Sequence, residues 1–293
     1  MSARSGIWFG IGAYGFWGMF PLYFLLLAKA TPQEIIAHRI VWTLLFALGC
    51  ALLTGQRKRL VAVFRETKVS ARLAAAGVLV AANWSIYVWA ITNGHLLDAA
   101  LGYFVNPLVT VLLAIAFLRE RLRRLQLAAL LVGSSAVVVI SVWYGQIPWI
   151  SLLLAVTFGF YGLLKKQVST QVTPLVGLTL ETLWVAPLAA AFIVFLQSSG
   201  EGTLTSVSPT HTIALLMAGV VTATPLLFFA SATRRVSLTT IALLQYICPL
   251  MQFIFGITVF NEDMPAVRWV GFALIWAALT ILTIDMLRNS HAE

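Results

Sequence analysis

Two charged residues, Arg39 and Glu181, interrupt stretches that are otherwise apolar enough to cross a membrane. A charge inside a bilayer costs at least about 2.5–3.5 kcal/mol on insertion scales, so each is expected to face the interior of a helix bundle and to have a function. A guanidinium can bind an anionic solute, and a carboxylate can carry a proton. We predict that these are the only two charges deep in the membrane.

Structural roles for the two charges compete with the functional ones. Each side chain could reach out to the membrane surface, or the two could form an ion pair. At about 1.5 Å of rise per residue, they lie on the order of 12 Å apart in depth, so a direct pair would require bending. The neighbouring His38 points about 100° away from Arg39. A lone His is more often a hydrogen-bonded structural residue, but imidazole titrates near neutral pH, so His38 is a second proton-coupling candidate besides Glu181.

Polar and aromatic side chains in the middle of other apolar stretches are candidates for a substrate pocket. An aromatic pocket with a few polar groups is typical of small-molecule sites, although membrane helices also use aromatic residues for packing and as interface anchors. The candidate substrate-binding residues are Arg39, Trp42, Asn83, Trp84, Tyr103, Asn106, Gln245, Tyr246, Trp17 and Tyr161.

The elements that must position these residues are membrane helices. Of the 293 residues, 60% are hydrophobic and 10% are charged, a composition that excludes a soluble globular protein. A helix needs about 20 apolar residues to cross the hydrocarbon core. Ten stretches meet this need, and they are continuously apolar rather than alternating, which predicts an all-α membrane protein. They are residues 6–28, 34–54, 73–97, 99–118, 125–143, 147–164, 174–197, 212–233, 236–260 and 266–287.

The sequence repeats itself at an offset of 142 residues, and Arg39 and Glu181 are equivalent by this offset. A fixed period indicates duplication of one structural unit. Each unit, 6–143 and 147–287, contains five predicted helices, and an odd number inverts the second copy, as in many secondary transporters. Matching residues are Thr31-Pro32 and Thr173-Pro174, Trp42 and Trp184, Ala76-Gly77-Val78 and Ala218-Gly219-Val220, Ala100-Leu101 and Ala242-Leu243, Pro107-Leu108 and Pro249-Leu250, and Glu120 and Glu262.

The net charge of +9 follows membrane topology rather than nucleic-acid binding. Lys29 and Arg268 are predicted to be external, and so is the polar loop at 198–210. Apart from Arg39, the other basic residues are predicted to lie on one side of the membrane, and they include those of a basic loop at 55–70. An excess of Lys and Arg marks the cytoplasmic side, so both termini are expected in the cytoplasm. These residues are Arg4, Arg57, Lys58, Arg59, Arg65, Lys68, Arg72, Arg119, Arg121, Arg123, Arg124, Lys165, Lys166, Arg234, Arg235 and Arg288.

Prolines and acidic residues mark the predicted fourth and ninth helices. Pro107 and Pro249 fall near the middle of these helices, where each removes a backbone donor and kinks the helix. Kinks are tolerated in membranes next to other helices or a water-filled cavity, so the pair indicates either a shared cavity or plain packing. Asp98 is expected to cap the fourth helix at its external end. Glu120 and Glu262 are expected at the membrane interface.

Four motifs together resemble the RarD branch of the EamA-type drug/metabolite transporters, and the resemblance covers residues 6–287. They are His38-Arg39-Ile40-Val41-Trp42, Asn83-Trp84, Leu101-Gly102-Tyr103-Phe104-Val105-Asn106-Pro107 and Glu181-Thr182-Leu183-Trp184. The resemblance implies a 5+5 inverted-repeat fold in the bacterial inner membrane. It also implies a central cavity lined by the first four helices of each half, with the fifth helix of each half peripheral. It implies no particular substrate.

The sequence therefore predicts a secondary transporter of a small organic metabolite or drug-like solute, with the lipid bilayer as its other partner. An anionic or amphipathic solute would suit Arg39. No Walker loop, zinc-protease motif or nucleotide fingerprint is present, so we expect no enzyme activity, no cofactor and no metal, and transport driven by an ion or solute gradient. Two alternatives remain open, an intramembrane lipid-modifying enzyme using Glu181 and His38, and a transport-inactive scaffold or regulator. The oligomeric state is not indicated.

Overall fold

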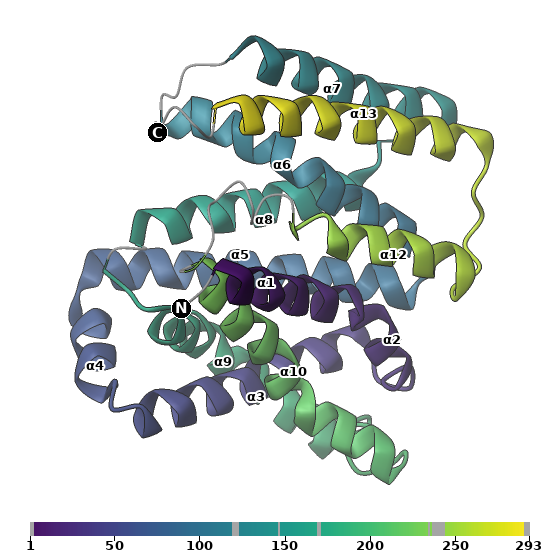
Figure 1. The fold of residues 1–293 in the computed structure, drawn as a ribbon. Coiled ribbons are helices and arrows are strands. Elements are labelled where there is room, and N and C mark those ends of the chain that lie inside the picture. The colour runs from purple at the N-terminus through teal and green to yellow at the C-terminus, as the bar shows by residue number, and fades with distance from the viewer. Residues whose placement is uncertain are drawn as a thin grey trace.

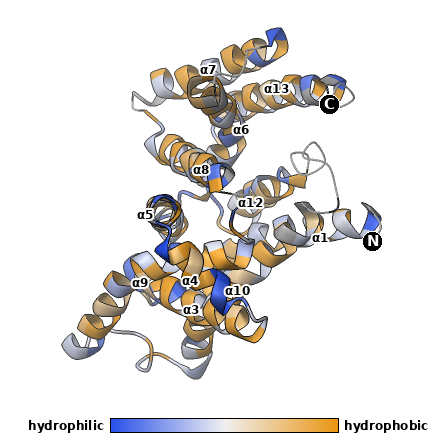
Figure 2. Ribbon diagram, turned by 90° about the vertical axis from the view of Figure 1, so that its left-hand side faces the viewer, coloured by the Kyte–Doolittle hydropathy of each residue, from blue (hydrophilic) through white to orange (hydrophobic). Residues whose placement is uncertain are grey.

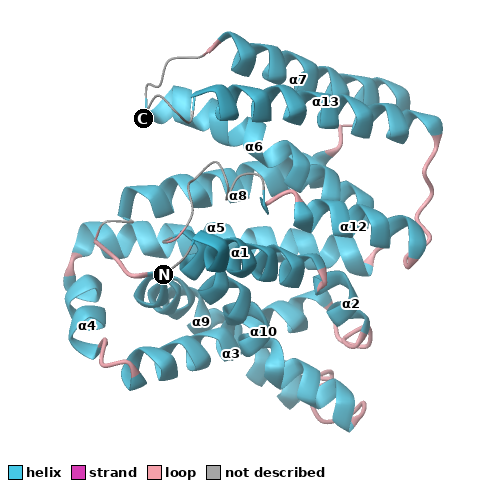
Figure 3. Cartoon of the chain, viewed as in Figure 1, coloured by secondary structure: helices cyan, strands magenta, loops and turns pink. Residues whose placement is uncertain are grey.

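The computed structural model describes residues 3–118, 123–145, 147–168, 171–233, 235 and 244–289, and this part of the chain contains helices, turns and loops but no strand (Figures 1 and 3). The all-helical prediction is confirmed. The helices are α1 (Ala3–Gly18), α2 (Phe20–Leu25), α3 (Pro32–Leu53), α4 (Arg57–Arg65), α5 (Thr67–Thr92), α6 (Leu96–Leu118), α7 (Arg124–Tyr144), α8 (Trp149–Val168), α9 (Pro174–Ser199), α10 (Pro209–Thr233), α12 (Ile247–Thr258) and α13 (Ala266–Asn289).

Seven of these helices, α3, α5, α6, α7, α9, α10 and α13, are long and apolar enough to cross a membrane. Helices α8 and α12 are apolar but shorter. Only 22 to 50% of the most apolar window of each long helix is buried within the protein, so much of the apolar surface faces outward, as lipid contact requires. Figure 2 shows hydrophobic residues spread along the helices. The helical membrane class is thus confirmed, and the number of ten crossings stays a prediction.

Three predicted elements differ from the structure. In the predicted stretch 236–260, the helix α12 begins only at Ile247, after a turn at Gln245 and Tyr246. The stretch 6–28 is not one helix but α1 followed by α2, because Pro21 near the start of α2 has no N–H to continue the hydrogen-bond ladder. The predicted loop 55–70 contains the helix α4. Leu60 and Val63, one turn apart, turn towards the protein while the charged residues around them face outward. The density of charge concealed this helical pattern.

The repeated Thr-Pro pair begins an equivalent helix in each half. The hydroxyl of Thr31 accepts a hydrogen bond from the N–H of Glu34 at 3.2 Å at the start of α3. The hydroxyl of Thr173 accepts one from the N–H of Val176 at 3.4 Å at the start of α9. In both helices proline fills one of the first two positions, where its missing N–H costs nothing.

The helices pack in pairs that are equivalent under exchange of the two halves. The contact between α1 and α10 is equivalent to the contact between α8 and α5. In the same way, the contact between α3 and α10 corresponds to that between α9 and α5. The contact between α6 and α8 corresponds to that between α12 and α1. Helices α7 and α13 pack mainly on each other and on α6, at the edge of the molecule (Figure 1). Helix α1 begins and α13 ends on the side where α4 lies (Figure 1).

Two repeated glycines allow close helix crossings at equivalent places in the two halves. A Cβ on Gly77 of α5 would collide with the carbonyl oxygen of Glu181 on α9. A Cβ on the equivalent Gly219 of α10 would collide with the carbonyl group of Trp42 on α3. Small residues let membrane helices approach in this way. The repeated Ala-Gly-Val motif therefore sets two distances, one between α10 and α3, which carries Arg39, and one between α5 and α9, which carries Glu181.

We predict that Gly219→Ala lowers the thermal unfolding midpoint in detergent by several degrees, because separating the two backbones costs about 1–3 kcal/mol. The matched control is Gly162→Ala in α8, where an added methyl group meets no atom within 4 Å. This control should keep or raise the midpoint, since Ala favours a helix over Gly by up to about 1 kcal/mol. Equal midpoints for the two variants would contradict the assigned role of Gly219.

Candidate functional site

Arg39 on α3 is buried among aromatic rings, with only 4% of its surface exposed. Its Nε donates a hydrogen bond to the hydroxyl of Thr222 on α10 at 2.9 Å. Its guanidinium carbon lies 4.3 Å from the ring centroid of Trp84, 4.9 Å from that of Phe20 and 5.9 Å from that of Phe24. Each distance is within the range over which an aromatic face attracts a cation. The three rings therefore replace part of the hydration that the guanidinium has lost, and we call them the aromatic box.

The charge of Arg39 is not neutralised within the described part of the chain. Nη1 is buried and has no hydrogen-bond partner there. No ion pair among the described residues joins Arg39 to a carboxylate. A guanidinium presents five N–H donors in a planar fork that fits a carboxylate or phosphate. The arrangement can therefore accept an anion from outside the chain.

Glu181 on α9 is fully buried and pairs with Lys165 rather than with Arg39. Its Oε1 lies 2.5 Å from Lys165 Nζ, and its Oε2 accepts a hydrogen bond from the Tyr161 hydroxyl at 3.2 Å. Glu181 is thus not an isolated charge, and no direct pair with Arg39 forms. Helix α8 continues to Val168, beyond the predicted end at residue 164, and this extension carries Lys165 to Glu181.

His38 and its neighbours form a separate polar group on α3. The indole N–H of Trp42 donates to His38 Nδ1 at 3.1 Å, so the proton of the neutral imidazole is on Nε2, which is buried without a partner in the described chain. Glu34, one turn earlier, accepts a hydrogen bond from the N–H of Thr203 at 2.7 Å. Glu34 is 1% exposed and Asp285 is 2% exposed, so two further acidic side chains, both near helix ends, are buried within the protein. That Arg39 and Glu181 are the only charges deep in the membrane stays a prediction. The folding of the 198–210 loop over Glu34 is not visible in the sequence.

Asn83 and Asn106 use their amide groups to join helices. Asn83 Nδ2 donates to the carbonyl oxygen of Leu154 at 3.0 Å, and Asn106 Nδ2 donates to that of Ala155 at 3.1 Å. The hydroxyl of Tyr103 donates to Asn83 Oδ1 at 3.3 Å. These contacts attach α5 and α6 to α8. In this arrangement the amides position helices, and their free hydrogen-bonding capacity is small.

The remaining predicted residues are divided between two regions. Trp17 packs against the hydrophobic cluster that contains two rings of the aromatic box, whereas Tyr246 packs against the cluster around α6, α7 and α13. Gln245 and Tyr246 lie in the turn before α12. Pro107 lies inside α6, as predicted, but Pro249 lies in the first turn of α12, where no intrahelical N–H is needed. Tyr246 therefore does not share the packing cluster of the Arg39 site.

Sequence reasoning missed Gln252 on α12. It is 1% exposed, and its Nε2 donates to the Tyr87 hydroxyl at 2.7 Å. The ring of Tyr87 lies 6.2 Å from that of Phe24 in the aromatic box and 5.5 Å from that of Tyr103. Gln252 thus connects α12 to the residues around Arg39. A polar side chain inside the apolar stretch 236–260 was the signal that could have identified it.

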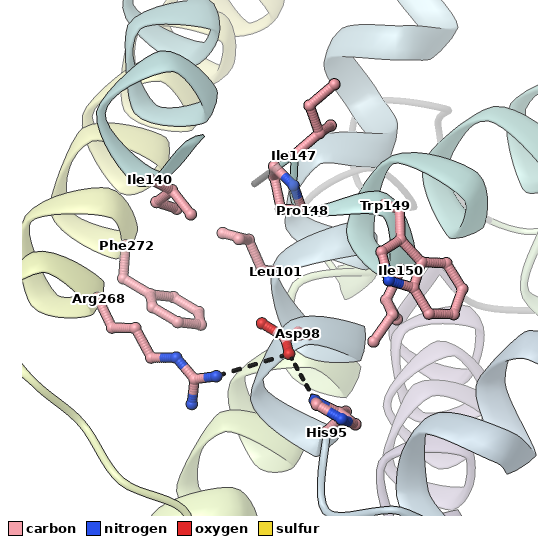
Figure 4. A pocket seen from close by; sticks show the side chains of 10 residues that line it. All are labelled: His95, Asp98, Leu101, Ile140, Ile147, Pro148, Trp149, Ile150, Arg268 and Phe272. Atoms are coloured by element: carbon pink, nitrogen blue, oxygen red, sulfur yellow. Dashed lines mark hydrogen bonds and ion pairs between the residues drawn. The ribbon is translucent and has the colours of Figure 1, made fainter. Parts of the chain in front are cut away.

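A cavity of about 150 Å³ lies away from Arg39, at the start of α6 (Figure 4). Arg268 Nη2 lies 3.5 Å from Asp98 Oδ2, and His95 Nδ1 lies 3.0 Å from the same oxygen, so these polar groups pair with one another. The cavity contains none of the predicted substrate-binding residues. It is lined by His95, Asp98, Leu101, Ile140, Ile147, Pro148, Trp149, Ile150, Arg268 and Phe272.

The start of α6 is capped by Glu262 rather than by Asp98. The backbone N–H groups of Leu96 and Leu97 donate to the Glu262 carboxylate, the second at 3.0 Å. The prediction for Asp98 is therefore wrong, because a carboxylate from a distant loop occupies the position of a local cap. Glu120 and the repeat match at 242–243 lie outside the described residues.

Comparison with known proteins gives the family. Residues 4–142 and again residues 147–284 match the EamA-like transporter family. This chain belongs to that family. The RarD protein of Streptomyces exfoliatus is 42% identical over 289 residues, covering 98% of this chain and 91% of the relative. An uncharacterized transporter of Vibrio cholerae is 38% identical over 291 residues, covering 99% and 95%.

A solved structure shares the fold of this EamA-family chain. It is a crystal structure that is 19% identical in sequence, with a TM-score of 0.62 over 97% of this chain and 98% of the other. The resemblance to the RarD branch is confirmed by the curated RarD relatives. Family membership and the apolar helices together identify a multi-pass protein of the bacterial inner membrane.

Proposed function

We propose that this EamA-family protein is a secondary transporter that moves a small organic solute with a negative charge, driven by a gradient of an ion or a second solute. The family and the Vibrio cholerae relative, which is named a transporter, support transport. The sequence contains no nucleotide-binding motif that would supply energy by hydrolysis. The single observation that favours an anionic solute is the buried, unneutralised guanidinium of Arg39.

The energetics of Arg39 favour an external anion. Each good contact with an aromatic face contributes about 0.5–2 kcal/mol, and a hydrogen bond to a charged group about 1.5–3 kcal/mol. A solute carboxylate or phosphate would supply the charge-assisted hydrogen bonds that Nη1 lacks. Because that interaction replaces no ion pair among the residues that the structure describes, its energy is available for binding.

The proposed contacts follow from the geometry. Arg39 grips the anionic group, while Trp84 provides an apolar wall beside it. In this proposal, Trp17 and Tyr103, which pack against the same hydrophobic cluster as the aromatic box, and Trp42, one turn further along α3, lie at the edge of the site. In this proposal Asn83, Asn106 and Tyr161 hold helices and Glu181 in place, and Gln245 and Tyr246 act at the end of α12 rather than at the solute.

Arg39→Ala is expected to abolish transport while the protein still inserts in the membrane. Arg39→Lys should remain about ten- to 100-fold below wild type, because an ammonium cannot form the paired hydrogen bonds of a guanidinium fork. The measurement is initial uptake into vesicles of the solute whose distribution between cells and medium depends on the wild-type protein.

The matched control for Arg39 is the exposed Arg124, and Arg124→Ala should transport at the wild-type rate. Full activity of Arg39→Ala would contradict the binding role. Loss of the protein from the membrane in both Arg39 variants would instead indicate a structural cation.

Coupling is proposed to involve the Lys165–Glu181 pair. A proton bound to Glu181 would remove the charge that holds Lys165, and the bond between α8 and α9 would weaken. Rocking of one repeat against the other could then expose Glu181 to each side of the membrane in turn. His38, whose Nε2 has no partner in the described chain, is the second candidate for this role.

Glu181→Gln should lose uphill accumulation and keep counterflow of labelled solute, because the amide retains shape and hydrogen bonding but cannot titrate. Uptake by the wild-type protein should depend on pH, whereas uptake by the Glu181→Gln variant should be nearly independent of pH. Glu201→Gln, which neutralises an exposed carboxylate in the 198–210 loop, is the control and should behave as wild type. A Glu181→Gln variant that still concentrates solute under an imposed pH gradient would rule out Glu181 as the coupling residue.

The proposed architecture comprises two inverted five-helix repeats, residues 6–143 and 147–287, making ten crossings with both termini in the cytoplasm. The exchange-equivalent packing of the two halves supports the repeats. The excess of basic residues on the side of α4 supports the orientation.

Fusions to alkaline phosphatase, which is active only outside the cytoplasm, test this topology. A fusion after residue 204 should be active, and a fusion after residue 287 should be inactive. The reverse pattern, or equal activity of both fusions, would show that the orientation or the number of crossings is wrong.

A further inference from the structure

Helix α4 and the beginning of α5 present a continuous basic surface. Its residues are all exposed, and they lie on α4, which connects α3 to α5, and on the first two turns of α5. Because α3 and α5 are long and apolar enough to cross a membrane, we expect their connection at the level of the lipid headgroups. We define the α4 basic surface as Arg57, Lys58, Arg59, Arg65, Lys68 and Arg72.

The charges of the α4 basic surface are not used within the described chain. No ion pair there joins any of these six residues to a carboxylate. Arg59 donates one hydrogen bond, to the carbonyl oxygen of Gln171 at 3.3 Å, and this contact leaves its charge uncompensated. Glu66 is the one acidic residue between 55 and 97. The surface therefore carries a strong local excess of positive charge.

Apolar side chains lie beside these charges and are also exposed. Leu53 is 91% exposed, Val61 40% and Phe64 44%. Val61 lines an open recess together with Arg57 and Lys58. An amphipathic helix with exposed apolar groups next to Lys and Arg is the pattern of a segment that lies in the membrane interface.

The equivalent connection in the second half shows that the fold does not require these charges. By the 142-residue offset, α4 corresponds to residues 199–207, a stretch with one acidic residue, Glu201, and no Lys or Arg. That connection forms turns rather than a helix, yet it joins α9 to α10 in the same way. The basic helix is thus a feature of the first half alone. Its expected position on the cytoplasmic side accounts for the sign of its charge, but not for the exposed apolar side chains that lie beside that charge.

We propose that the α4 basic surface is a binding site for the headgroup phosphate of an anionic phospholipid, such as phosphatidylglycerol. The basic side chains contact the phosphate, and the exposed Leu53, Val61 and Phe64 contact the upper part of the acyl chains. Clusters of Lys and Arg next to a membrane helix attract anionic lipids, with a contribution from each charge. Phe64 stacks on Trp184 of α9, with ring centroids 5.6 Å apart, so a bound lipid would also hold α4 against the helix that carries Glu181.

The test measures lipid binding by the purified full-length protein in neutral detergent. Native mass spectrometry counts the phosphatidylglycerol molecules that remain bound across a titration, with phosphatidylcholine as the neutral comparison. The test variant combines Arg57→Gln, Lys58→Gln and Arg65→Gln. The matched control combines Arg4→Gln, Arg124→Gln and Arg288→Gln, which removes the same charge from exposed positions outside α4.

The wild-type protein should bind phosphatidylglycerol in preference to phosphatidylcholine, and the test variant should bind it at least about tenfold more weakly, as the loss of three interfacial charges implies. The control should bind as wild type. A variant with Arg57→Lys and Arg65→Lys should also bind phosphatidylglycerol, since it preserves the charge. It shows whether the loss of binding in the test variant reflects the loss of charge or a change in folding.

Four results would overturn the proposal. They are unchanged binding by the test variant, an equal loss in the control, a loss in the lysine variant, and equal binding of the two lipids by wild type. Excess inorganic phosphate should not displace the lipid. Displacement by phosphate alone would identify a site for the free ion and would contradict a lipid site.

Discussion

A guanidinium buried in a membrane protein must recover the hydration that it has lost. Arg39 recovers part of it from Thr222 and from the three rings of the aromatic box. These partners come from α2, α5 and α10, so their positions depend on how closely those helices approach α3. The close crossing at Gly219 and the capped start of α3 at Thr31 fix that approach. These contacts hold Arg39 in place but do not neutralise it, so Arg39 is a cation without a counter-charge in the described chain.

The two halves of the protein share a scaffold but differ in their chemistry. The Thr-Pro helix starts and the Ala-Gly-Val crossings recur at equivalent positions. At the equivalent positions of Arg39 and Glu181, however, one half holds a cation with no counter-charge among the described residues, and the other holds a carboxylate paired with Lys165. The two halves therefore share a backbone arrangement, while a few side chains give these equivalent positions different electrostatic surroundings.

The sequence predicted the features that depend on local pattern. Long apolar stretches identified the helices, the repeat identified equivalent positions such as Gly77 and Gly219, and burial of Arg39 followed from its apolar surroundings. Contacts between distant segments could not be predicted in this way. The Glu262 cap on α6 and the Lys165 partner of Glu181 depend on helix ends and loops that meet only in the folded chain.

Some residues were named correctly for their burial but not for their surroundings. Asn83 and Asn106 are buried, yet their amides bind backbone carbonyl groups of α8, which the polarity of the side chain alone cannot distinguish from a solute contact. Tyr246 belongs to a different hydrophobic cluster from Trp17 although both are aromatic residues in apolar stretches. Periodicity gives the position of a residue along a helix, whereas its neighbours depend on the packing of all the helices.

We propose that an anionic solute neutralises Arg39, and an untargeted comparison of metabolites in cells and medium, with and without the protein, tests this directly when the metabolites are sorted by charge at neutral pH. The solutes whose distribution changes should carry a carboxylate or phosphate group. A set of cationic or neutral solutes, with no anion among them, would contradict it.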